Sequence, residues 1–101
     1  MIGLTGELIP APRGHKVGLV NRLTPRGGAL DEALALARAI AGNGPLAVAA
    51  SKRILMEAPE WPAAERFDRQ REISEPVRAS EDAREGATAF AEKREPVWRG
   101  R

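Results

Sequence analysis

Beyond residue 28, the apolar side chains of the chain recur at helical spacing. Over residues 30–41 they fall three or four positions apart, with two acids in the first turn and a Gly-Asn-Gly stop at residues 42–44. A second series begins with Pro45, since proline is favoured at a first helical position, and it ends before Pro59. We therefore predict two helices, and their short connection indicates that they pack as neighbours.

Two further helices are predicted from their boundaries. The third starts near Trp61 and runs to Ile73 with a heavily charged surface, and Pro76 should end or kink it. Ser80 can cap a fourth helix through its side-chain oxygen, and Pro96 stops that helix. The inner face of the fourth helix is expected to consist of Ala83, Gly86, Ala87 and Phe90.

The N-terminal part of the chain has a different pattern. Glycines and prolines interrupt residues 1–16, so no long regular element fits there, and we predict a connector. Residues 17–23 read V-G-L-V-N-R-L and predict one short strand, whose pairing partner the chain does not obviously supply. The expected fold is mainly α, with about four helices and one short strand. It forms a single partial domain over residues 1–101, with the connector and strand followed by a helical subdomain and basic tail over residues 28–101.

Composition and charge exclude several classes of function. The chain has 101 residues with no Cys and one His, so neither a disulfide framework nor a zinc site is expected. That single His15 lies in the connector and does not suggest a nucleophilic triad. The net charge is only +2, and the four cations of residues 93–101 lack a groove-filling motif. We therefore expect no metal and no nucleic-acid partner.

The expected location is the cytoplasm. The first residues contain no basic leading segment before an apolar run, so they do not resemble a secretory signal. The longest stretch without charge is residues 39–51, which is shorter than the roughly 17 to 25 apolar residues that span a bilayer. We accordingly expect a soluble protein that does not enter a membrane.

One group of residues has the chemistry to bind a nucleotide. Phe90, Lys93 and Arg94 stand at positions i, i+3 and i+4, which places a ring and two cations on adjoining helix surface. The ring could stack on a base while a cation meets phosphate oxygens. The alternative is a buried Phe90 beside cations that merely suit the negative end of the helix dipole. Spacing alone leaves both interpretations open.

Several motifs together resemble a known family. They are L-T-G-E at 4–7, G-L-V-N at 18–21, N-G-P-L-A at 43–47, S-K at 51–52, S-E-D at 80–82, E-G at 85–86 and A-F-A-E-K-R at 89–94, then Pro96, Trp98 and Gly100. In order and spacing they resemble the C-terminal part of enoyl-CoA hydratase/isomerase (crotonase-family) proteins, over almost the whole chain. Pro12 and Gly14 depart from the Glu- and Ala-rich helix that the family places before its G-L-V strand. The N-terminal spiral of the family is not expected in this chain.

The resemblance implies both a fold and a chemistry. The fold is the C-terminal helical subdomain of the crotonase β/α spiral. The complete family holds an acyl-CoA thioester carbonyl between two backbone N–H donors while a carboxylate moves protons. No catalytic residue can be assigned in this chain. Phe90 and Lys93, however, match family positions that contact the adenine and phosphate end of coenzyme A, sometimes from a neighbouring subunit.

These implications define two candidate functions. The first is the C-terminal part of an acyl-CoA-processing hydratase or isomerase, which contributes CoA-binding and oligomer contacts and is not catalytic alone. No resident cofactor is expected, because coenzyme A arrives as part of the thioester substrate. The second is a truncated paralogue that acts as an interaction module on a full-length relative. The expected partners are therefore an acyl-CoA thioester and either further copies of the chain or a larger crotonase-like chain.

Overall fold

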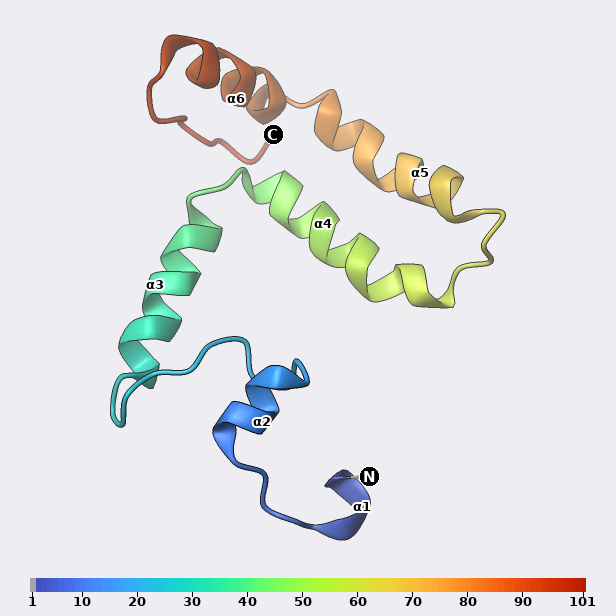
Figure 1. The fold of residues 1–101 in the computed structure, drawn as a ribbon. Coiled ribbons are helices and arrows are strands. Elements are labelled where there is room, and N and C mark those ends of the chain that lie inside the picture. The colour runs from blue at the N-terminus through green and yellow to red at the C-terminus, as the bar shows by residue number, and fades with distance from the viewer. Residues whose placement is uncertain (1) are drawn as a thin grey trace. The chain divides into compact units, whose positions relative to one another are not determined.

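The computed structural model describes residues 2–101, and their regular structure is entirely helical (Figure 1). The elements are α1 (Ile2–Thr5), α2 (Ala11–Lys16), α3 (Ala29–Ala41), α4 (Pro45–Glu57), the 3-10 helix η1 (Ala58–Glu60), α5 (Arg66–Arg78) and α6 (Glu81–Glu92). The mainly α class is confirmed, with more helices than the sequence pattern predicts. The chain divides into two compact units, Met1–Ala37 and Arg38–Arg101, and the division falls within α3.

Two short helices replace most of the predicted connector. In α2, Pro12 occupies one of the first two positions, where its missing N–H removes no helical hydrogen bond. Gly14 is buried, and a Cβ there would lie 3.3 Å from Cγ2 of Val20. The connector prediction misses this short helix across Pro12 and Gly14, although neither helix before Val17 is long. Met1 lies outside the described residues.

The predicted strand over residues 17–23 is also wrong. This segment forms a turn and irregular backbone in which Gly18 has a φ of 78°. The N–H groups of Leu19 and Val20 donate to the carbonyl of Gly14 at 2.9 and 3.2 Å. The segment therefore curls back on α2 and uses backbone groups that a strand would offer to a partner. No other described segment provides such a partner, and an unpaired strand is not stable by itself.

In the C-terminal unit, α4 and α5 pack side by side and α6 follows α5 (Figure 1). Pro45 begins α4 as predicted, and the turn through η1 buries Trp61. Ser80 caps α6, because its Oγ accepts the N–H of Ala83 at 3.0 Å. Pro76 does not end α5 at once, since the helix continues for two residues to Arg78.

Residues 95–101, here called the C-terminal strap, run back beside α6 (Figure 1). The indole Nε1–H of Trp98 donates to the carbonyl of Gly42 at 2.8 Å. The ring lies against Gly44 and Gly86, so a Cβ on Gly86 would come within 3.1 Å of it. The tryptophan of the strap therefore packs against the small residues of α6.

Phe90 does not belong to that inner face, contrary to the expectation from its spacing. Its side chain is 87% exposed, whereas Ala89 is buried. Other large apolar side chains of the same unit are also exposed: Ile40, Leu55, Met56, Phe67 and Val97. Among the described residues, no single helix is long and apolar enough to cross a membrane, although α3 and α4 with η1 reach that length and composition as a broken pair.

Candidate functional site

The last turn of α6 brings Phe90 and Lys93 next to each other on exposed surface. Phe90 lies on the helix, and Lys93 follows its last residue with φ 53° and ψ 42°. Lys93 is the one residue other than glycine with a positive φ in residues 2–101. This left-handed conformation is typical of a helix end, but glycine is the residue that usually adopts it.

Two backbone hydrogen bonds close the turn. The N–H of Lys93 donates to the carbonyl of Phe90 at 3.3 Å, and the N–H of Arg94 donates to the carbonyl of Ala89 at 3.0 Å. These bonds satisfy carbonyl groups that the end of a helix would otherwise leave unpaired. The turn therefore reverses the chain directly after α6 and starts the strap.

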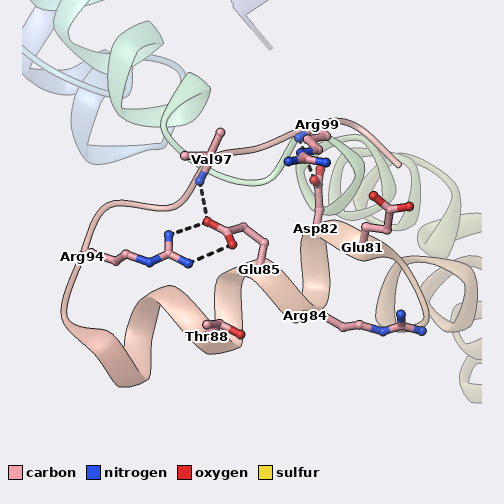
Figure 2. A pocket seen from close by; sticks show the side chains of 8 residues that line it. All are labelled: Glu81, Asp82, Arg84, Glu85, Thr88, Arg94, Val97 and Arg99. Atoms are coloured by element: carbon pink, nitrogen blue, oxygen red, sulfur yellow. Dashed lines mark hydrogen bonds and ion pairs between the residues drawn. The ribbon is translucent and has the colours of Figure 1, made fainter.

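Arg94 is held by carboxylates, as Figure 2 shows for its bond to Glu85. Its two terminal nitrogens donate to the two oxygens of Glu85 at 2.6 and 3.0 Å, and its Nε donates to Glu92 at 2.6 Å. Glu85 also accepts the N–H of Val97 at 2.8 Å. Of the two cations that the sequence places beside Phe90, Arg94 is thus engaged, while Lys93 forms no ion pair within residues 3–101.

Glu85 and Arg94 both remain charged at neutral pH. The hydrogen bond from Arg94 lowers the pKa of Glu85 from its ordinary value to about 2, and the backbone N–H of Val97 contributes further. The same contact, with Glu92 as the second partner, raises the pKa of Arg94. Glu85 is therefore a structural carboxylate and is not suited to accept or deliver protons near neutral pH.

Asp82 anchors the far end of the strap. Its two carboxylate oxygens accept the N–H groups of Arg99 at 2.7 Å and Gly100 at 2.9 Å, while its own N–H donates to the carbonyl of Arg101 at 3.0 Å. A hollow of about 510 Å³ lies between α6 and the strap (Figure 2). It is lined by Glu81, Asp82, Arg84, Glu85, Thr88, Arg94, Val97 and Arg99.

These anchors are not visible in the sequence pattern. Glu85 and Arg94 are nine positions apart, which matches no helical repeat, because Arg94 lies beyond the turn at Lys93. His15, in the other unit, directs its Nδ1 at the carbonyl of Val20 at 3.0 Å. The described residues contain no group of three or more His, Cys, Asp or Glu side chains that could hold a metal ion.

Comparison with protein families agrees with the helical fold and with the sequence motifs described above. All of residues 1–101 match the family model for enoyl-CoA hydratase/isomerase, so the chain belongs to that family. Enoyl-CoA hydratase EchA19 of Mycobacterium tuberculosis is 45% identical over 98 residues, which are 97% of this chain and 37% of the relative. Carnitinyl-CoA dehydratase of Citrobacter koseri is 40% identical over 102 residues, with coverage of 97% and 39%.

Solved structures give the same result. A crystal structure of enoyl-CoA hydratase from M. tuberculosis H37Rv has a TM-score of 0.94 and 53% identity, and enoyl-CoA hydratase EchA1 from Mycobacterium marinum has 0.93 and 53%. Each comparison covers 97% of this chain and 39% of the solved chain. The chain thus spans about two fifths of the length of these relatives, consistent with a C-terminal portion of the family.

Proposed function

We propose that this chain is the C-terminal part of an acyl-CoA-processing enzyme of the hydratase/isomerase type, and that it contributes contacts to coenzyme A and between subunits. The family match over residues 1–101 is the observation that carries the proposal. The names of the relatives, enoyl-CoA hydratase and carnitinyl-CoA dehydratase, both describe reactions of CoA thioesters. A CoA thioester is therefore the proposed substrate class, and the protein's own compartment is proposed to be the cytoplasm.

Phe90 and Lys93 are the proposed contacts to the nucleotide end of coenzyme A. An exposed ring can stack on adenine, and an ammonium group without an ion-pair partner in residues 3–101 can meet phosphate oxygens. Both contacts lie far from the thioester carbon within the substrate. They should therefore stabilise the bound substrate and the transition state about equally, which changes KM and leaves kcat nearly constant.

A hybrid enzyme tests this proposal. The 98 matched residues of M. tuberculosis EchA19 are replaced by those of this chain, and KM and kcat are measured for an enoyl-CoA and for the same acyl group on pantetheine, which lacks the nucleotide. Lys93→Ala should raise KM for the CoA ester roughly tenfold to 150-fold, the equivalent of about 1.5 to 3 kcal/mol for a hydrogen bond to a charged group. Phe90→Ala should act in the same direction, but added salt should reduce only the effect at Lys93.

The matched control is Lys16→Ala, which removes the same charge from an exposed position at the end of α2 and should leave KM for both substrates unchanged. KM for the pantetheine ester should not respond to Lys93→Ala. Equal impairment of both substrates would contradict the proposed nucleotide contact and would favour a role for Lys93 in the helix end alone.

The exposed apolar side chains support a second candidate, an interaction module that binds a full-length relative. Leu55, Met56 and Phe67 are 76%, 71% and 79% exposed, and apolar surface of this kind is common at protein interfaces. Co-purification of the tagged chain with purified full-length relative would favour this second function. Binding only to a relative that lacks its own C-terminal portion would favour the first.

A further inference from the structure

We infer that the chain accepts a strained backbone at Lys93 in order to present that ammonium group, and that Glu85, acting through Arg94, is the residue that positions it. This inference rests on the proposed contact between Lys93 and the nucleotide end of coenzyme A. It adds a positioning residue that touches no substrate and explains why a lysine stands where the backbone favours glycine.

The first observation is the backbone conformation. A φ of 53° and ψ of 42° place Lys93 in the left-handed region, where the Cβ of an L-residue is crowded by its own backbone. Glycine avoids this crowding and is the usual residue at such a helix end. A non-glycine residue persists in such a conformation when the surrounding structure holds it, and such positions concentrate at binding sites.

The second observation is the clamp formed by Glu85 and Arg94 on both sides of the turn. Glu85 lies on α6 before Lys93, and its carboxylate holds the guanidinium of Arg94 and the N–H of Val97 after it. In Figure 2 the strap leaves the end of α6 and returns to Glu85 through these two contacts. The chain after Lys93 is therefore tied to a carboxylate on the helix before it, which restricts the turn to this conformation.

The third observation concerns the charges next to Lys93. Glu92 directly precedes it in the sequence and carries the adjacent carboxylate. The Nε of Arg94 binds Glu92 at 2.6 Å, so that carboxylate is already paired. The clamp thus has two effects: it fixes the turn and it leaves the Lys93 side chain available to an anion.

Stability and substrate affinity should consequently change in opposite directions at Lys93. In the full 101-residue chain, Lys93→Gly should relieve the crowding and lower the unfolding equilibrium constant by about tenfold, whereas Lys93→Ala should not. In the hybrid enzyme, both substitutions should raise KM for the CoA ester equally, since both remove the ammonium group. A lysine with only a structural role would not separate these two measurements.

The clamp is tested with Glu85→Gln, with Glu95→Gln as the matched control because the Glu95 side chain forms no ion pair within residues 3–101. Glu85→Gln should accelerate amide hydrogen exchange at Arg94 and Val97 in the full chain while exchange in α4 and α5 stays slow, which shows that the fold persists. In the hybrid enzyme, Glu85→Gln should raise KM for the CoA ester. It should leave kcat and KM for the pantetheine ester unchanged. Glu95→Gln should change none of these values.

The outcomes separate this inference from the function on which it rests. If Lys93→Ala leaves KM unchanged, the proposed nucleotide contact itself is wrong. If Lys93→Ala raises KM but Glu85→Gln loosens the turn without affecting KM, the contact stands and the positioning role is overturned. Failure of Lys93→Gly to stabilise the chain would overturn the claim that the turn is strained.

Discussion

At the scale of single residues, two acids one turn apart on α6 organise the C-terminal strap. Asp82 binds the backbone near its end, at Arg99 and Gly100, and Glu85 binds its beginning through Arg94 and Val97 (Figure 2). Both carboxylates accept backbone N–H groups of the strap. The two side chains therefore act as anchors for the strap.

The lowered pKa of Glu85 predicts an acid-dependent loss of stability. The folded carboxyl remains ionised down to a pKa of about 2, beside Arg94 and Arg99, while the unfolded group takes up its proton near 4.5. The folded state therefore binds fewer protons in this interval, and the stabilisation is complete above about pH 5 and declines toward pH 2. Urea denaturation of the chain and of Glu85→Gln between pH 2 and 6 should show that the parent has the larger free energy of unfolding. This difference in free energy should shrink as the pH falls. A constant difference across this interval would refute the prediction.

Asp82 should contribute to stability through its contacts with the strap backbone. The side chain is only 5% exposed, and Asp82→Ala would leave the N–H groups of Arg99 and Gly100 without their acceptors. We expect a loss of about 1.5 to 3 kcal/mol in the free energy of unfolding, since these hydrogen bonds involve a charged acceptor. Asp82→Asn keeps one acceptor oxygen and should lose less. Equal stability of Asp82→Ala and the parent chain in urea denaturation would contradict this assignment.

At the scale of elements, Trp98 connects the strap to the start of α4 and to α6. Its Nε1–H binds the carbonyl of Gly42, and its ring is in contact distance of Gly44 and Gly86. Gly86 lies inside α6, where glycine is ordinarily less favourable than alanine by roughly 0.5 to 1 kcal/mol. The close approach of the indole ring explains why a residue without a side chain suits this position.

Gly86→Ala should therefore destabilise the chain, against the usual helix preference. The new Cβ would lie 3.1 Å from the Trp98 ring, which its hydrogen bond to Gly42 holds in place, and overpacking of this kind costs about 1 to 3 kcal/mol. The same substitution in a Trp98→Leu background should be neutral or stabilising, because the clash is absent. The comparison is between the Tm values of the parent chain, Gly86→Ala, Trp98→Leu and the double variant. Stabilisation by Gly86→Ala in the parent would show that the ring moves freely.

At the scale of the whole molecule, many large apolar side chains of the described residues are exposed to solvent. Among residues 3–101, Trp61 and Ala89 are the buried hydrophobic side chains, whereas Leu8, Leu55 and Phe90 are largely exposed. Much apolar surface consequently stays in contact with water and does not stabilise the fold of the chain. This surface agrees with a chain that spans about two fifths of the length of its relatives.

The isolated chain should be marginally stable and should self-associate. Exposed Leu, Met and Phe side chains favour association because it removes apolar area from water. Sedimentation velocity over a range of concentrations should show a growing share of oligomers, and the thermal transition should be broad. A compact monomer at every concentration with a cooperative transition at high temperature would contradict this prediction.

The sequence by itself determined the long helices and the family of this protein. The apolar spacing over residues 30–41 corresponds to α3, and the series from Pro45 corresponds to α4, with starts and ends set by local residues such as Pro45 and Ser80. These features depend on side chains within one or two turns, so a sequence pattern contains them. The family motifs were also local, and the match over residues 1–101 confirms the family.

Only the tertiary structure decided how distant residues meet. Residues 17–23 are apolar enough for a strand, but a strand requires a partner, and local hydrogen bonds to α2 replace it. Phe90 has the spacing of an inner residue, yet Trp98 from the strap occupies that face and Phe90 is exposed. The role of Phe90 and Lys93 toward coenzyme A stays a prediction. The bond between Glu85 and Arg94 depends on the left-handed turn at Lys93, which reverses the direction of the chain. The spacing of residues in the sequence does not predict a contact made across such a reversal.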